Sequence, residues 1–547
     1  MEKKAIVALA LSLLVLIGYQ HIMSRMYPVQ KMPLYSSESV QQPVNQAKSV
    51  DISAQNVQLS QEYVELAEKE KEFSFKNDLY TVIFSNIGGS IKSITLNTNA
   101  KSGLNIPFEI FKSTSPDQGI LLFSPDKLGA YLNSTVYTVK STDDGIIFSH
   151  VFADDIAVEK KIKFTNSLYR IDLDITFKNL KSGDTVRKYA LISGIGAAAV
   201  KSDERYLEVS SNNADGKVTR FKKRGKPFEI EQISSPSWVM LKTRYISMIA
   251  HPAIPCTGSL AKQEYAGSLI TGPIVKDFAI PANSSVLHSF SMYVGPSDLG
   301  LLKKADIGAD SALTYGFFGG ISQLLISLLK FYHVVFRNWG IAIIMLTLSV
   351  NILLFPLTRK SYKSMQEIQI LQPKIEKLKA EHKGNPQKFQ KELMELYKKY
   401  KVNPMGGCLP MLLQMPIFIA LYQGLMNSLD LRGSSFLWIR DLSLPENLKI
   451  PFTAPLIGNT VNLIPLMILV AMFFQQKISN QLMAISQTED QKQQQKFMMF
   501  MMPVMFGFLF YNFPSGLGLY WFANTVIMTI YQRIFTRMPK PEHLTAD

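Results

Sequence analysis

Cysteine is nearly absent from this chain, with two residues among 547. So few cysteines exclude a disulfide-stapled fold and any zinc site built from cysteine thiolates. Charged residues are also scarce, at 18% of the chain, whereas soluble domains hold about a quarter. Because 47% of the residues are hydrophobic, the composition also excludes intrinsic disorder, collagen and coiled-coil rods.

Catalytic motifs are missing as well. The chain has no H-E-x-x-H, no G-x-S-x-G and no phosphate-binding loop, and His150, His251 and His288 are scattered. We therefore predict a protein that is not an enzyme, that holds no cofactor or metal, and that hydrolyses no nucleotide.

The formal net charge of +15 fits two classes, a nucleic-acid binder or a membrane protein with cationic inner loops. Much of the charge is concentrated between residues 359 and 401, where twelve basic residues stand against five acidic ones. The segment before residue 310 is close to neutral. This distribution favours the membrane protein, and we expect no DNA partner.

Uncharged apolar runs are long enough to cross a bilayer. The first follows two lysines and precedes no small-residue cleavage site, so we interpret it as an uncleaved signal anchor. The predicted spans are residues 1–23, 338–358, 404–429, 456–476, 497–513 and 517–535. Since Lys and Arg mark cytoplasmic loops, both termini are predicted inside. This places the loop 430–455 outside, and the segments 359–403, 477–496 and the tail 536–547 inside.

The segment between the first two spans changes character twice. Residues 24–62 are rich in Gln, Ser and Pro and are predicted to form a disordered linker. Apolar and polar residues then alternate, most regularly from Tyr169 to Phe177, which predicts half-buried strands in an exported all-β sandwich over 63–310. Residues 311–337 predict an amphipathic helix lying in the outer membrane–water interface, with a seventh span as the alternative.

Residues 359–403 predict a basic helical hairpin in the cytoplasm. Apolar residues recur at helical spacing on both sides of Gly384-Asn385-Pro386, which breaks the chain. Its lysines set topology, and could also meet anionic lipid headgroups or ribosomal RNA. The predicted fold is thus a multi-domain membrane protein: a six-span α-helical bundle with an exported all-β sandwich and a cytoplasmic helical hairpin.

Polar residues occur inside the predicted spans. Thr347 and Asn351 are four apart, so they share one helix face. Gln414 and Asn524 lie in two other spans. Such side chains either join helices by hydrogen bonds or line a wet cavity, and the residues leave both readings open. No acidic residue falls at the centre of a span, which argues against an ion-coupled pump.

Methionine is unevenly distributed: 14 of the 24 lie at or after Met405. Its unbranched thioether adapts to varied apolar partners, as on promiscuous binding surfaces. This skew is compatible with contacts to many different apolar chains, although ordinary packing between membrane helices accepts methionine too.

Three motifs give the chain a resemblance to a known family. They are Lys401–Cys408 (KVNPMGGC), Gln414–Phe418 (QMPIF) and Phe513–Leu517 (FPSGL). With these motifs the chain resembles the YidC/Oxa/Alb family of membrane protein insertases, in its Gram-negative form with a large periplasmic domain. The resemblance implies that it inserts and folds proteins of the cell inner membrane, alone or with the Sec translocon. It further implies a hydrophilic groove open to cytoplasm and lipid.

The same resemblance assigns site residues. The positions that match a groove contacting the client's polar tail are Thr347, Asn351, Tyr520 and Trp521. The positions that match a hydrophobic slide for the client's apolar segment are Leu409, Pro410, Met415, Pro416 and Pro503. The implied partners are nascent membrane proteins, the Sec translocon with its accessory subunits, membrane lipids and the ribosome, the last through the hairpin and the 477–496 loop.

One position departs from the family pattern. The family usually has an arginine five residues before the proline that aligns with Pro356, and here that residue is Asn351. The nearest basic residue along the helix is Arg359. An amide can hydrogen-bond an incoming tail but cannot attract an acidic one by charge. We therefore expect clients with weakly charged tails, or a weaker electrostatic capture step.

Two other functions are the alternatives. A polytopic solute transporter with an exported binding domain lacks support, because no inverted repeat and no intramembrane carboxylate is found. A membrane-anchored periplasmic enzyme lacks a catalytic set.

Overall fold

The computed structural model describes most of the chain from residue 69 to residue 536. The stretches outside the described residues are 1–68, 99–106, 114–118, 124–131, 197–205, 214, 223–227, 234, 264–267, 314–316, 383–384, 401, 404–408, 455–457, 484–488 and 537–547. The predicted anchor at 1–23, the predicted linker at 24–62 and nearly all of the predicted tail at 536–547 therefore lie outside the described residues.

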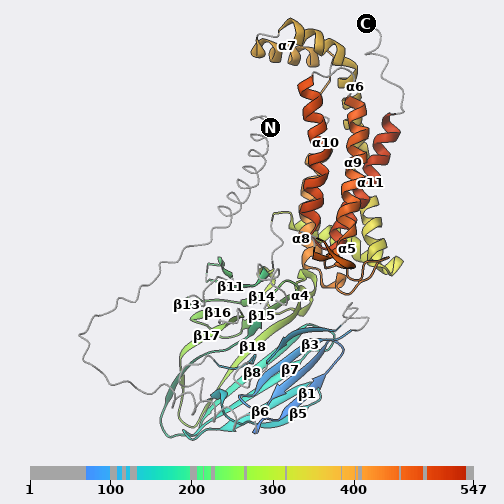
Figure 1. Ribbon diagram of the computed structural model, residues 1–547. Coiled ribbons are helices and arrows are strands. Elements are labelled where there is room, and N and C mark those ends of the chain that lie inside the picture. The colour runs from blue at the N-terminus through green and yellow to red at the C-terminus, as the bar shows by residue number, and fades with distance from the viewer. Residues whose placement is uncertain are drawn as a thin grey trace, which may run out of the picture.

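The described residues before 314, which we name the β domain, are rich in antiparallel sheet (Figure 1). A four-stranded sheet contains β1 (Glu72–Lys76), β2 (Tyr80–Ser85), β3 (Ser90–Leu96) and β4 (Phe108–Lys112). A nine-stranded sheet has the order β12 (Val218–Lys222), β11 (Glu208–Asn212), β14 (Val239–Lys242), β15 (Ile246–Pro252), β18 (Ser285–Pro296), β8 (Arg170–Asn179), β7 (Ile156–Phe164), β6 (Gly145–Val151) and β5 (Thr138–Thr142). A five-stranded sheet contains β10 (Gly194–Gly196), β17 (Leu269–Ile280), β16 (Gly258–Gln263), β13 (Phe228–Ile233) and β9 (Thr185–Ala190).

Strand β8 shows why this part of the sequence forms sheet. Its burial alternates along the whole strand, with Ile171, Leu173 and Ile175 fully buried and the residues between them partly exposed. Period-two alternation is what a strand with one covered face requires. The strand predicted from Tyr169 to Phe177 is therefore confirmed.

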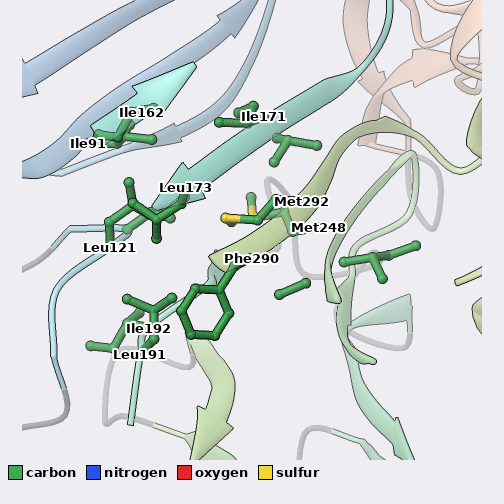
Figure 2. Packing of buried hydrophobic residues seen from close by; sticks show 14 of the residues in the cluster. Ile91, Leu121, Ile162, Ile171, Leu173, Leu191, Ile192, Met248, Phe290 and Met292 are labelled. Carbon is green, nitrogen blue, oxygen red and sulfur yellow. The ribbon is translucent and has the colours of Figure 1, made fainter. Parts of the chain in front are cut away.

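The core of the β domain lies between facing sheets. Figure 2 shows Ile91 of β3, Ile162 of β7, Leu173 of β8 and Phe290 of β18 converging on one apolar cluster. Each of these side chains is at most 1% exposed. Burying such a side chain stabilises the fold by about 1.5–3 kcal/mol. This cluster therefore holds the four-stranded sheet against the nine-stranded sheet.

The residues after 316 form helices, which we name the helical bundle. They are α5 (Gly319–Phe336), α6 (Trp339–Glu381), α7 (Pro386–Lys399), α8 (Leu409–Asn427), α9 (Leu463–Met483), α10 (Glu489–Phe510) and α11 (Ser515–Thr536). The short elements α4 (Leu299–Ala305), η2 (Asp310–Ala312) and η4 (Leu429–Leu431) lie at the junction with the β domain, and β19 (Leu448–Ala454) pairs with β20 (Gly458–Val461) in a two-stranded sheet. Figure 1 shows the β domain at one end of the bundle and α7 at the other.

Helix α6 is longer than predicted. It begins at an Asn338 cap, whose side chain accepts a hydrogen bond from the Ile341 amide at 3.1 Å, and it continues without a break to Glu381. The predicted span at 338–358 and the first half of the predicted hairpin are thus one helix. The apolar run ends at residue 358, but Lys, Glu, Gln and Met are strong helix formers and carry the helix onward.

The hairpin itself is present. Leu371 and Val402 share a small apolar cluster, Lys374 Nζ donates to the Tyr400 hydroxyl at 2.5 Å, and His382 Nε2 lies 2.8 Å from a carboxylate oxygen of Glu392. Residue numbers rise on one helix as they fall on the other, which is the pattern of antiparallel partners. The second half of α6 therefore folds back on α7.

Other predicted boundaries shift. The predicted loop at 477–496 is mostly helical, because α9 continues to Met483 and α10 begins at Glu489. The predicted span at 456–476 begins later, since β20 precedes α9. Among the described residues, two helices are long and apolar enough to cross a membrane, α5 and α6, with shorter apolar stretches at Leu463–Ser479 and Met499–Phe510. The six-span count and the interfacial position of 311–337 remain predictions.

Candidate functional site

A layer of polar side chains is buried between α6 and α11. Thr347 is fully buried and donates from Oγ1 to the Ile343 carbonyl at 2.7 Å. One turn further along α6, Asn351 is 2% exposed. Its Nδ2 donates to the Thr347 carbonyl at 2.8 Å and to Oδ1 of Asn524 on α11 at 2.9 Å. The polar face predicted on α6 is thus directed at α11.

A second polar pair joins α8 to α11. Gln414 Nε2 lies 2.6 Å from the hydroxyl of Tyr520, and both side chains are buried. Trp521, the next residue, packs edge-on against Phe418 of α8 at 5.0 Å between ring centroids and stacks on Phe506 of α10 at 5.3 Å. Residues of the predicted groove therefore lie where α8, α10 and α11 meet.

All buried polar side chains described in α6, α8 and α11 are uncharged. They are Thr347, Asn351, Thr358, Ser361, Ser364, Gln414, Ser515, Asn524, Thr525 and Gln532. Arg359 is exposed on α6. The layer can therefore hydrogen-bond a polar chain, but it supplies no ionic attraction at the depth of Asn351.

Several buried polar atoms of the bundle have no hydrogen-bond partner. They include Asn351 Oδ1, Gln414 Oε1, Gln423 Oε1, Trp521 Nε1 and Gln532 Oε1. Leaving such an atom unpaired costs about 1–3 kcal/mol, so these atoms mark places where water or a bound chain is favoured. The observed pairs act as interhelical links, while the unpaired atoms favour a wet site, so both readings of the polar residues have support.

The orientation of the Asn351 amide is fixed by its neighbours. The Thr347 carbonyl can only accept a hydrogen bond, so the amide nitrogen must face it. The oxygen of Asn351 is consequently the atom without a partner. This position presents an acceptor where the family resemblance leads us to expect a cationic donor.

The predicted slide residues divide between surface and interior. Met415 on α8 is 44% exposed, Pro416 is half-buried, and Pro503 on α10 is buried. Leu409 and Pro410 lie in the first turn of α8, and their side chains are outside the described residues. Met415 therefore lies on the outer surface of the bundle, whereas Pro503 is covered by other side chains.

Sequence reasoning missed the exposed apolar face of α10. Its members are Phe497, Phe500, Met501, Val504, Met505, Phe508 and Leu509. They recur at spacings of three and four, which is the pattern of one helix face. The number of methionines in this region does not by itself reveal this spacing. On α8 the corresponding exposed residues are Leu412 and Met415. In the described part of the chain, no cluster of His, Cys, Asp or Glu could hold a metal ion.

A large β domain joined to an apolar helical bundle with a buried polar layer is an architecture typical of an integral membrane protein. The family model described as "60Kd inner membrane protein" matches residues 330–542. The family model described as "YidC periplasmic domain" matches residues 72–328. The chain belongs to the YidC family of membrane protein insertases.

Three relatives, each named membrane protein insertase YidC, show how far the similarity extends. The protein of Pelobacter propionicus is 31% identical over 98% of this chain and 99% of its own length. That of Syntrophus aciditrophicus is 31% identical over 96% and 98%, and that of Geotalea daltonii is 30% identical over 99% and 100%. Among solved structures, a galactose mutarotase-like protein from Lactobacillus casei has a TM-score of 0.31 and 9% identity over 41% of this chain, which is too weak to bear on function.

Proposed function

We propose that the buried polar layer receives the polar tail of a nascent membrane protein while the client's apolar segment moves along α8 and α10 into lipid. One observation carries this proposal. Unpaired, uncharged polar atoms lie between α6, α8 and α11, and exposed apolar side chains such as Met415 and Val504 lie on the adjoining helices.

The energetics favour this arrangement. A polar tail crossing hydrocarbon loses its hydrogen bonds to water at a cost of several kcal/mol for each group. Acceptors such as Asn351 Oδ1 and Gln414 Oε1 replace part of that hydration. Transfer of the client's apolar segment to lipid is favourable by about 25 cal/mol per Å², which supplies the driving force without nucleotide hydrolysis.

The proposal includes a topology and a set of partners. The chain is placed in the inner membrane with six spans, both termini in the cytoplasm and the β domain in the periplasm. Its partners are nascent membrane proteins, the Sec translocon with its accessory subunits, and lipids. Exposed lysines on α7, which are Lys388, Lys391, Lys398 and Lys399, support contact with anionic lipid or with ribosomal RNA.

The test is photo-crosslinking to a ribosome-stalled membrane protein. A photoreactive side chain is placed at Met415 or Val504, and at Pro503, the buried neighbour of Val504 on α10. Val470 on α9, which is 51% exposed, is the matched control because it is equally apolar but belongs to neither α8 nor α10. We expect client adducts from Met415 and Val504 at several-fold higher yield than from Val470.

The outcomes separate the possible functions. A solute transporter or an anchored enzyme gives no client adduct at Met415 or Val504. Equal yields at Met415, Val504 and Val470 would show that the client samples the bundle surface at random, and would contradict a path along α8 and α10.

A further inference from the structure

A buried arginine of the β domain reaches into the helical bundle. Arg244 lies in the turn between β14 and β15 and is only 7% exposed. Its Nε donates to the Met426 carbonyl at 3.1 Å, and its Nη2 donates to the Ser443 carbonyl at 3.1 Å. Both acceptors belong to the bundle side of the junction, roughly two hundred residues further along the chain.

The Met426 carbonyl is one that α8 cannot satisfy by itself. Helix α8 ends at Asn427, and the last four carbonyls of a helix have no intrahelical donor. A cation at this end also interacts favourably with the helix dipole. The last turn of α8 contains no basic residue of its own. Arg244 therefore provides, from another domain, the cap and the charge that the helix lacks.

Aromatic rings hold the guanidinium in place. The Arg244 guanidinium carbon lies 4.8 Å from the ring centroid of Tyr245, and Arg432, from the segment after α8, lies 5.6 Å from the same ring. Arg432 also lies 4.7 Å from the ring of Phe108 on β4. One arginine from each side of the junction thus contacts Tyr245, and such contacts restrict the guanidinium plane.

Two further contacts extend the junction. Lys330 of α5 lies 2.8 Å from a carboxylate oxygen of Asp298, at the start of α4, and 3.4 Å from one of Asp430 in η4. Leu429, two residues after α8, is 3% exposed and belongs to the apolar core of the β domain. The end of α8 is therefore held by a cap, an ionic bridge and an apolar anchor.

We infer that Arg244 is a positioning residue: it docks the β domain onto the bundle and fixes the end of α8 nearest the β domain. A fixed end limits how far α8 can slide or rotate. It therefore sets the position along the bundle axis at which Gln414 meets Tyr520 and at which Met415 is exposed. The docking role follows from the contacts alone, whereas the consequence for clients rests on the proposed function.

The test is hydrogen exchange on the full-length protein in lipid nanodiscs. Arg244→Gln removes the charge and the two-pronged donor, and Arg244→Lys keeps the charge with a single donor group. Arg220→Gln is the control, because Arg220 of β12 pairs with Glu208 of β11 at 3.2 Å, within one sheet of the β domain rather than across the junction. Amides of β8 report whether the β domain stays folded.

In Arg244→Gln we expect amides from residue 421 to residue 444 to exchange at least about tenfold faster, the effect of losing one charge-assisted hydrogen bond. Arg244→Lys should lie between this variant and the wild type, and Arg220→Gln should match the wild type. Exchange in β8 should not change. Unchanged exchange over 421–444 in Arg244→Gln, or equally faster exchange throughout β8, would overturn the docking role.

Crosslinking from Met415 in the same variants separates this inference from the proposed function. If α8 loosens and the Met415 adduct falls with it, positioning is supported. If α8 loosens and the adduct is unchanged, positioning of clients is overturned and the insertase path stands. If the wild type gives no adduct at Met415, the proposed path fails, and the exchange result still decides the docking role.

Discussion

Asn351 on α6 donates a hydrogen bond to Oδ1 of Asn524 on α11, over 2.9 Å, in the interior of the helical bundle. Two neutral amides thus join helices at the position where the family resemblance leads us to expect an arginine. Because the nitrogen of Asn351 also binds the Thr347 carbonyl, its oxygen is left as an acceptor. The site is built for hydrogen bonding rather than for charge.

Asn351→Arg should make insertion depend on acidic residues in the client tail. A guanidinium at this position can form a charge-assisted hydrogen bond to a tail carboxylate, worth about 1.5–3 kcal/mol. We expect replacement of the tail aspartates by asparagine to lower insertion about tenfold or more in the variant and little in the wild type. The measurement is insertion of a small client into proteoliposomes. Equal losses in both proteins contradict the prediction, and Asn351→Gln serves as the neutral control.

Tyr520→Phe should destabilise the bundle. It removes the hydroxyl that lies 2.6 Å from the Gln414 amide and leaves that amide buried without this partner, at a cost of about 1–3 kcal/mol. The free energy of unfolding in mixed micelles measures the change. Tyr531→Phe, on the same helix and half-buried, is the matched control and should be close to neutral. If both variants lose the same stability, the Gln414–Tyr520 bond contributes nothing specific.

Lys160 is a fully buried cation in the β domain. Its Nζ donates to the Gly88 carbonyl at 2.6 Å and to the Leu121 carbonyl at 2.8 Å, and it lies 4.4 Å from the ring of Phe123. Burial nevertheless lowers the pKa of this ammonium to about 7. The unfolded chain, with a lysine pKa of about 10.4, therefore binds more protons than the folded chain between these two values.

Stability of the β domain should consequently rise as the pH increases from about 7 to about 10, by at most about 1.4 kcal/mol per pH unit. Lys160→Met should remove this slope, while Lys161→Met, the outward-facing neighbour on β7, should keep it. Pulse proteolysis of the β domain in guanidinium measures the stability at each pH. A Lys160→Met protein with the same slope as the wild type would rule out Lys160 as its source.

Asp298 should make the junction sensitive to acid. Burial of its carboxyl favours the neutral form, but the Lys330 ammonium and the Leu301 and Gly300 amides outweigh burial, so the pKa of Asp298 lies below its usual value. A depressed pKa contributes stability above the unfolded value of about 3.9, which is lost as the pH falls through the folded value.

We therefore expect exchange of the α4 and η4 amides to quicken only below about pH 4 in the wild type. Asp298→Asn should show the quicker exchange already at pH 7, because it removes the ion pair with Lys330. Asparagine still caps α4 as well as aspartate does, so the helix start is preserved. If exchange in Asp298→Asn at pH 7 is as slow as in the wild type, the ion pair between Asp298 and Lys330 does not stabilise the junction.

Local pattern was enough to predict much of the architecture. Alternation around Leu173 predicted a strand, apolar spacing around Leu371 predicted the hairpin, and the separation of Thr347 from Asn351 predicted one polar face. Each of these signals is contained within a few turns or one strand, so the sequence displays it directly.

Contacts between distant segments could not be predicted in this way. The cap of α8 by Arg244 joins residues that are 182 positions apart, and the Gln414–Tyr520 bond spans 106. No periodicity links such pairs, because their meeting depends on how whole helices and sheets pack. The polar start of α10 at Glu489 was missed for a different reason: its glutamines and lysines form helix well but do not look like a membrane span.

The unbroken course of α6 has a mechanical consequence. From Asn351 to Lys374, where the hairpin contact to Tyr400 is made, the helix advances by ~35 Å at 1.5 Å per residue. No loop interrupts this course, but Pro356 and Pro373 lie within it and each removes one intrahelical hydrogen bond, so α6 bends most easily at these two positions. A displacement of α7 is therefore transmitted to the amide pair between Asn351 and Asn524 only through a helix that can bend at two intermediate points.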